Sequence, residues 1–317
     1  MKPRDLLLAV AVVVVWGINF VVIDVGLEGI PPLLLSALRF FFAAVPAIFL
    51  LGRPQVPWRY VVGVGLALGV AKFGLLFIAM DHGVPAGLSS LVLQSQVIFT
   101  VLFAIAVLRE RPRPAQLAGI VVACIGIALI VLDQQLSAPL GALVLVIVAA
   151  GFWGVSNTIT RYAKPPDTLR FMVWVSAVAV VPLLLLSLLT EGPRADVDAL
   201  RGIRLSGIGA IAYLAFAATL FGFGVWGYLL RQYDASTVAP FSLLVPVVGM
   251  SAAWVLRGEA VGAQQAIAAV LVIGGMACTI VRRPSPRKGQ PKAPSAASAS
   301  RAPATTGTPV RHPRSTP

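Results

Sequence analysis

Trp16-Gly17-Ile18-Asn19 in the first half of the chain and Trp153-Gly154-Val155-Ser156-Asn157 in the second half share one pattern, and each lies inside a long apolar stretch. Further pairs follow in the same order: Arg39-Phe40 with Arg170-Phe171, and residues 86–116 with residues 235–265. Similar residues that recur in a fixed order predict an internal repeat. Helices rich in Ala, Val and Leu also resemble one another by chance, but several matches in one order disfavour that explanation.

The composition predicts an all-α membrane protein. Of the 317 residues, 58% are hydrophobic and 12% are charged, whereas soluble domains carry about 25% charged residues. Apolar stretches of about 20 residues, the length that crosses a bilayer, follow one another from Leu6 to Val281. The surroundings of the chain are therefore expected to be the lipid bilayer.

Ten transmembrane helices are expected, because charged residues or Pro and Gly separate ten apolar stretches. The stretches cover residues 5–23, 31–51, 58–80, 86–108, 114–132, 139–161, 168–190, 205–230, 236–256 and 262–281. From Pro284 onward the chain is rich in Pro, Ser, Ala, Thr and basic residues. Residues 284–317 are therefore predicted to form a disordered basic cytoplasmic tail.

Basic residues predict the orientation, because Lys and Arg near helix ends are retained in the cytoplasm. With the N-terminus inside, the inner side holds eleven cations before the tail: Lys2, Arg4, Arg53, Arg59, Arg109, Arg111, Arg113, Arg161, Lys164, Arg170 and Arg231. The outer side holds four: Arg194, Arg201, Arg204 and Arg257. Both termini are therefore predicted to be cytoplasmic. The net charge of +13 resides in these loops and the tail, which argues against nucleic acid as a partner.

The number of spans per repeat predicts a carrier. Five is an odd number, so the second copy enters the membrane from the opposite side, which gives two inverted five-helix repeats over residues 1–137 and 138–283. Inverted halves exchange conformations and open a central site to each face in turn, the mechanism called alternating access.

The same residues resemble a known family, the EamA-type carriers of the drug/metabolite transporter superfamily. The resemblance covers residues 5–281 and is carried by the Trp-Gly pairs, Arg39, and the ends of the fourth and ninth spans at Glu110 and Glu259. Three segments are similar, more narrowly, to the exporters of cysteine and O-acetylserine: residues 14–22, 89–96 and 238–249. The resemblance implies efflux of cysteine-pathway amino acids across the bacterial inner membrane. A carrier of another solute, such as an aromatic amino acid, a purine or an organic cation, remains the alternative.

Two cations inside spans are the first candidates for substrate binding, because a charge in hydrocarbon needs a partner or a water-filled cavity. Lys72 lies about 14 residues into the third predicted span, roughly 21 Å from its inner end at 1.5 Å per residue. Its ammonium group is a candidate for binding a substrate carboxylate. Arg39 reaches a similar depth in the second span, and is either a second anion anchor or a structural partner of helix-end carbonyls.

Amides and aromatic rings complete the predicted site. Gln94 and Gln96 stand two residues apart on the fourth span, so they point to different sides, and one of them is expected to line the site. Asn19 and Asn157 occupy matching places in the first and sixth spans and offer amide groups from both halves. Trp16 and Trp153 are candidates for lining the pathway, with anchoring at the membrane interface as the alternative.

The ninth span contains Pro240 and Pro246 with Ser242 between them. Proline leaves a helix carbonyl without its amide partner, so these residues are predicted to form a hinge, and Ser242 a polar substrate contact. A fixed structural kink is the alternative.

A membrane-embedded enzyme is the main rival from another class. The sequence has no paired carboxylates at depth and no Cys/His spacing for a metal, and its two histidines are His82 and His312. We therefore expect no enzyme activity, no metal and no cofactor. The partners are expected to be a small-molecule substrate and lipid, and the oligomeric state, including a homo-oligomer, stays open.

Overall fold

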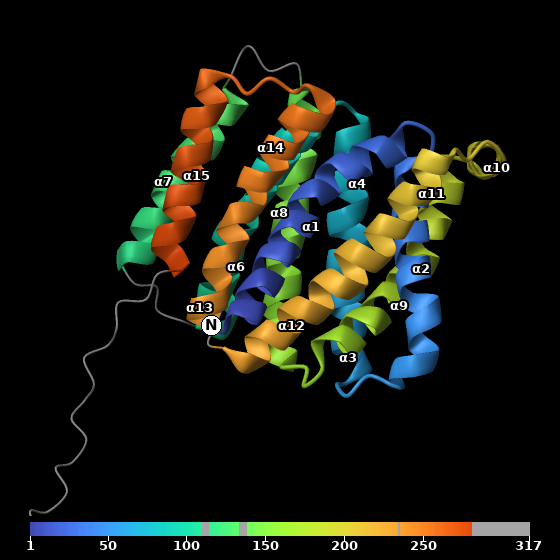
Figure 1. Cartoon of the computed structure of the whole chain (residues 1–317), viewed down its shortest axis with the longest axis horizontal. Coiled ribbons are helices and arrows are strands. Elements are labelled where there is room, and N and C mark those ends of the chain that lie inside the picture. Colours follow the sequence, from blue (N-terminus) through green and yellow to red (C-terminus); the bar gives the residue numbers. More distant parts are fainter. Residues whose placement is uncertain (110–113, 133–137, 234, 281–317) are drawn as a thin grey trace, which may run out of the picture. The chain divides into compact units, whose positions relative to one another are not determined.

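The computed structural model describes residues 1–109, 114–132, 138–233 and 235–280 (Figure 1). Every regular element in these ranges is helical. The predictions for Glu110 and for the tail at residues 284–317 lie outside the described residues.

Within this part of the chain, nine helical runs are long and apolar enough to cross a membrane. They span Pro3–Leu27, Pro32–Leu51, Trp58–Asp81, Ala86–Val107, Pro114–Val131, Leu140–Ala163, Thr168–Thr190, Leu205–Gln232 and Ala239–Arg257. The tenth predicted span corresponds to a further apolar helix, α15 (Ala263–Ile280). The hydropathy pattern thus located the apolar helices well.

Five of the nine runs are single helices: α1 (Pro3–Leu27), α2 (Pro32–Leu51), α7 (Pro114–Val131), α8 (Leu140–Ala163) and α9 (Thr168–Thr190). Pro31 and Pro139 directly precede α2 and α8, while Pro3 and Pro32 begin α1 and α2. Proline is tolerated at these places because its missing N–H has no intrahelical partner there.

The remaining four runs are interrupted, which the apolar pattern did not predict. A π-helical segment lies in the third run, α3 (Trp58–Val64), η1 (Gly65–Lys72), α4 (Phe73–Asp81), and in the eighth, α11 (Leu205–Ala212), η3 (Tyr213–Phe221), α12 (Gly222–Gln232). A 3₁₀ segment lies in the fourth run, α5 (Ala86–Val92), η2 (Leu93–Ser95), α6 (Gln96–Leu108), and in the ninth, α13 (Ala235–Val238), η4 (Ala239–Leu244), α14 (Val245–Arg257). The interruptions therefore fall at corresponding places in the two halves.

Helices from one half pack against helices from the other. The helix α1 contacts α14, α8 contacts α6, and α2 contacts α9. The helices α7 and α15 lie side by side, as the green and orange-red ribbons of Figure 1 make plain. In each of these pairs one helix precedes residue 137 and the other follows it.

Glycines at matching positions permit two of these contacts. A Cβ atom on Gly17 of α1 would lie 2.5 Å from Val248 and 3.0 Å from the backbone nitrogen of Gly249. A Cβ atom on Gly154 of α8 would lie 2.8 Å from Phe99 and 3.0 Å from the backbone nitrogen of Thr100. Small residues let transmembrane helices approach closely, so the glycine of each Trp-Gly pair permits a close contact, of α1 with α14 and of α8 with α6.

A short helix, α10 (Pro193–Arg201), lies between α9 and α11, where the sequence analysis predicted no helix. It is anchored by Asp196, whose carboxylate accepts a hydrogen bond of 2.9 Å from the hydroxyl of Ser187. Its charged residues kept it out of the apolar pattern on which the prediction was based.

Candidate functional site

Arg39 lies in the middle of α2 and is 2% exposed. Its Nε donates a hydrogen bond of 3.1 Å to Oγ1 of Thr219 in η3, and Thr219 in turn donates one of 2.8 Å to the carbonyl of Leu214. The guanidinium carbon lies 4.0 Å from the ring centroid of Phe73. The atom Nη1 is buried and has no hydrogen-bond partner in the described part of the chain. One edge of the guanidinium is therefore fixed and the other is left without a partner.

Lys72 is the last residue of η1 and is 4% exposed. Its Nζ atom lies 3.2 Å from the ring centroid of Phe73 and 4.7 Å from that of Trp153 on α8. Aromatic faces attract cations, by about 2 kcal/mol when both groups are desolvated. No hydrogen bond or ion pair of Nζ occurs within the ranges that the structure describes. Lys72 and Arg39 thus share one aromatic ring, and the structure brings together the two cations that the sequence analysis singled out.

Carboxylates in the described ranges make their contacts at helix ends, and none lies within ion-pair distance of Arg39 or Lys72. Asp5 accepts from two tyrosines, Glu191 from the amides of Leu33 and Leu34, and Glu259 from the start of α5. Burying an unpaired charge is strongly unfavourable, which makes the two cations a candidate site for an anion.

Gln96 and Asn157 belong to a polar cluster between α6 and α8. Nδ2 of Asn157 donates to Oε1 of Gln96 at 2.8 Å and to Oγ1 of Thr100 at 3.1 Å. Thr100 also donates to the carbonyl of Gln96 at 2.7 Å. These two predicted site residues therefore bond each other, and this cluster ties the two helices together.

Asn19 differs from its counterpart Asn157. It is 7% exposed, and its Oδ1 atom is buried without a partner among the described residues. In the alignment of residues 86–116 with 235–265, Gln96 and Thr100 correspond to Val245 and Gly249, which have no polar side chain. The crossing of Asn19 therefore lacks the acceptors that Nδ2 of Asn157 uses. The buried Oδ1 of Asn19 is a candidate acceptor for a ligand.

Gln94 contacts the interrupted part of the ninth run. Its Nε2 lies 3.4 Å from the carbonyl oxygen of Ser242, to which it donates a weak hydrogen bond. That carbonyl would accept from the amide of residue 246 in a continuous helix, but Pro246 has none. The hydroxyl of Ser242 bonds the carbonyl of Ala239 at 2.8 Å. Pro240 lies in the 3₁₀ segment, so both predicted hinge prolines lie where the helix is broken.

Trp16 and Trp153 are both partly buried against the core. Trp16 contacts the π-helical segment η3 of the eighth run, and Trp153 contacts the π-helical segment η1 of the third run. Nε1 of Trp16 donates a hydrogen bond of 3.0 Å to the carbonyl of Ala218 in η3, and its ring packs against Phe223 and Trp226. Trp153 lies over Lys72. Of the two, only Trp153 contacts a buried charge within the described residues.

Three polar or aromatic contacts of the structure were not anticipated from the sequence. Phe73 and Thr219 hold Arg39, and no local pattern distinguishes them from other apolar or small polar residues in a span. Asp5, only 4% exposed, accepts a hydrogen bond of 2.6 Å from the hydroxyl of Tyr233. This bond raises the pKa of Tyr233. An acid in the first turn of an apolar helix was a visible signal for such a partner.

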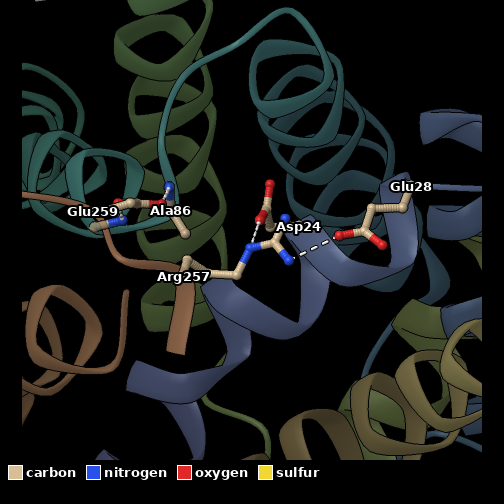
Figure 2. A network of polar contacts seen from close by, with 6 residues as sticks. Asp24, Glu28, Ala86, Arg257 and Glu259 are labelled. Atoms are coloured by element: carbon tan, nitrogen blue, oxygen red, sulfur yellow. Dashed lines mark hydrogen bonds and ion pairs between the residues drawn. The ribbon is translucent and has the colours of Figure 1, made fainter. Parts of the chain in front are cut away.

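A second polar network lies at the C-terminal ends of α1 and α14 (Figure 2). Nε of Arg257 lies 2.6 Å from Asp24, and Nη1 lies 2.8 Å from Glu28. Both carboxylate oxygens of Glu259 accept hydrogen bonds of 2.9 Å from the amides of Ala86 and Gly87. Such a carboxylate satisfies donors that the first turn of a helix leaves unpaired.

A groove of about 520 Å³ lies between α14 and α15, and its lining is mostly apolar. It is lined by Val247, Met250, Ser251, Trp254, Val261, Ala266, Ala269, Val270 and Ile273. None of the predicted site residues lines it. The groove has no charged side chain in its lining, so we place the candidate site at the buried cations.

Apolar helices of membrane-spanning length that enclose buried polar and charged residues define a multi-pass membrane protein, and the buried charges are its candidate binding groups. A sequence profile of the EamA-like transporter family matches residues 4–132 and 140–281, and the chain belongs to this family. The protein is therefore a membrane transporter and not an enzyme.

Relatives of known name agree with this class. A probable amino-acid metabolite efflux pump of Salmonella typhimurium is 43% identical over 283 residues, which cover 87% of this chain and 94% of the relative. The protein of the same name from Escherichia coli K12 is 41% identical with the same coverage. A solved crystal structure with 21% sequence identity has a TM-score of 0.58 and matches 88% of this chain and 96% of its own, which shows a shared fold.

Proposed function

We propose that the protein exports small polar amino-acid metabolites of the cysteine and O-acetylserine type across the bacterial inner membrane. Membership of the EamA-like family and the names of two enterobacterial relatives support export of this class. The observation that carries the proposal is the pair of buried cations, Arg39 and Lys72, against the ring of Phe73. Every amino acid has a carboxylate, and this is the group that two such cations bind best.

The rest of the proposed site suits an amino-acid substrate. Nη1 of Arg39 and Nζ of Lys72 would bind the carboxylate, while Trp153 and Phe73 would cover it. The unpaired Oδ1 of Asn19 is a candidate acceptor for the ammonium group. Gln94, Gln96, Asn157, Ser242 and Trp16 are proposed to shape the surrounding pathway. Arg39 and Lys72 would repel a positively charged solute, which disfavours an organic cation as the substrate. An aromatic amino acid or a purine remains an alternative substrate.

We also propose the predicted architecture of ten spans in two inverted repeats, residues 1–137 and 138–283, with α15 as the tenth span. The paired glycine contacts of α1 with α14 and of α8 with α6 support it. So do the π and 3₁₀ segments at corresponding places, and the two stretches matched by the family profile. Cytoplasmic termini follow from the distribution of basic residues in the loops.

The transport cycle is proposed to be alternating access, with the interrupted helices as its moving parts. Pro240 and Pro246 leave the ninth run without a continuous hydrogen-bond ladder, so bending there breaks few bonds. The hydrogen bond from Gln94 to the carbonyl of Ser242 would break during this motion.

Uptake of labelled cysteine and O-acetylserine into proteoliposomes tests the proposal. We expect saturable uptake by the intact protein and a loss of at least about tenfold for Lys72→Ala, a factor that corresponds to about 1.4 kcal/mol. Arg53→Ala, a change at an exposed loop residue, is the matched control and is expected to transport normally. A panel of aromatic amino acids, purines and organic cations is added as competitors. Uptake of a competitor but of neither amino acid would refute the proposed substrate class.

A further inference from the structure

The two buried cations have a consequence for how the carrier returns after releasing its substrate. Arg39 and Lys72 are 2% and 4% exposed, and both lie against the single ring of Phe73. Two like charges repel strongly in a low-dielectric interior. The ring of Phe73 attracts both cations and the ring of Trp153 attracts Lys72, but neither ring carries a net charge, so they do not neutralise the pair.

Thr219 fixes the geometry of this pair toward a ligand. Its Oγ1 accepts from Nε of Arg39 and its own hydrogen goes to the carbonyl of Leu214. Thr219 is thereby held in place, and the guanidinium is turned so that Nη1 remains buried and unpartnered among the described residues. Nζ of Lys72 lies against the rings of Phe73 and Trp153 and has no hydrogen bond or ion pair in the described part of the chain. A carboxylate has two oxygens, and it would supply one acceptor to each cation.

From this geometry we infer that the carrier passes through its closed state only with a carboxylate bound between Arg39 and Lys72, and therefore works as an exchanger. This inference rests on the proposed function of the same site. An alternating-access carrier must pass a state in which the site is closed to both sides. The closed state is accessible when an anion pairs with both cations. It is unfavourable when Arg39 and Lys72 are buried together without an anion. Export of one carboxylate is then coupled to entry of another.

The charges elsewhere in the described spans agree with exchange as the coupling mode. No carboxylate of these residues lies within ion-pair distance of either cation, so no acidic side chain there can compensate the pair when the site is empty. The carboxylates that do make contacts lie at helix ends, such as Asp5 with Tyr233 and Glu191 with the amide of Leu33. Since no described carboxylate pairs with either cation, we expect the compensating charge to come from solution.

The first test measures transport with and without a carboxylate on the far side. Full-length protein is reconstituted in sulfate buffer, and labelled O-acetylserine is supplied outside. The vesicles contain either unlabelled O-acetylserine or its methyl ester, which lacks the carboxylate. We expect initial uptake to be at least about tenfold faster with the carboxylate inside. Equal uptake into both kinds of vesicle would overturn exchange.

Variants separate this coupling from a merely structural role. Lys72→Gln removes one charge and retains a polar group, so the empty carrier should return more easily and the ratio of the two uptake rates should fall toward one. Arg53→Gln changes an exposed cation and should leave the ratio unchanged. A ratio that stays high in Lys72→Gln while all rates fall together would contradict the inference.

The second test does not depend on the proposed substrate. The melting temperature of the purified full chain is measured with acetate, with succinate and with acetamide. Both carboxylates should raise it in the intact protein and in Arg53→Gln, but acetamide should not, and neither carboxylate should raise it in Arg39→Gln. The absence of any carboxylate effect in the intact protein would overturn the inference.

The two proposals fail in different ways. If carboxylates bind but O-acetylserine moves into no vesicle, the proposed substrate is wrong. The exchange test is then run with the carboxylate that stabilises most as the labelled solute, against its own amide inside the vesicles. Faster uptake against the carboxylate supports exchange, and equal uptake overturns it.

Discussion

The contact of α8 with α6 and the contact of α1 with α14 are built from the same sequence pattern, yet they are joined by different chemistry. In both, a glycine after a tryptophan allows the close approach, at Gly154 and at Gly17. Between α8 and α6, Asn157 bonds Gln96 and Thr100. At the other crossing Asn19 has an unpaired oxygen, and Arg257 joins the helix ends by ion pairs. The glycine contacts thus recur at the two crossings, while the polar contacts differ.

The largest expected effect tests whether the two crossings are equivalent in packing. Gly17→Ala and Gly154→Ala each place a Cβ atom within 3.0 Å of a backbone nitrogen on the facing helix. Overpacking of this kind costs about 1–3 kcal/mol, and both variants should lose this much stability. Thermal unfolding in detergent is the measurement.

The control for this pair is Gly141→Ala, since a Cβ there meets nothing within 4 Å. It should unfold like the unmodified protein. If only one of the two crossing variants is destabilised, the crossings are not equivalent.

The next effect separates the two asparagines. Asn157→Leu leaves Oε1 of Gln96 without its donor, and a buried unsatisfied group of this kind costs about 1–3 kcal/mol. Asn19→Leu removes an atom that has no partner, so stability should be unchanged or slightly higher, while uptake of O-acetylserine should fall. Unfolding and proteoliposome uptake are measured for both variants. Equal stability losses would contradict the difference between the halves.

The sequence predicted the spans because burial in lipid leaves a long apolar pattern that needs no tertiary information. It also singled out Arg39 and Lys72, because a charge in such a pattern is conspicuous. The shared ring of Phe73 and the bond to Thr219 were not predictable, since they join residues from distant helices. The unpaired Oδ1 of Asn19 was not predictable either, because it depends on which groups the neighbouring helices bring to it. A change from α to π or 3₁₀ geometry does not alter the hydropathy of a run, so the hydropathy pattern could not predict these segments either.

A smaller effect is expected from the break in the ninth run. Pro246→Ala restores an amide that can donate to the carbonyl of Ser242, in competition with Nε2 of Gln94. The bond from Gln94 is long, at 3.4 Å, so little stability is lost with it. The free energy of unfolding should therefore increase, or fall by less than about 1 kcal/mol. If the break is a hinge, the transport rate should nevertheless fall severalfold. Unchanged transport would favour a fixed kink, and Pro240→Ala gives the comparison within the same segment.

The smallest effect concerns the ion pairs of Arg257 with Asp24 and Glu28. Among the described residues, these pairs occur at the α1–α14 crossing and not at the α8–α6 crossing. Arg257 is 32% exposed, Asp24 27% and Glu28 50%, so water and salt screen these pairs. Arg257→Gln should reduce stability by about 0.2–1 kcal/mol at low salt, and by less at high salt. Unfolding is measured at both ionic strengths, with Arg53→Gln as an exposed control.

Glu259→Gln keeps an acceptor for the amides of Ala86 and Gly87 but loses the negative charge at a helix start. If its stability loss exceeds that of Arg257→Gln, the cap on α5 contributes more to this end of the crossing than the ion pairs do.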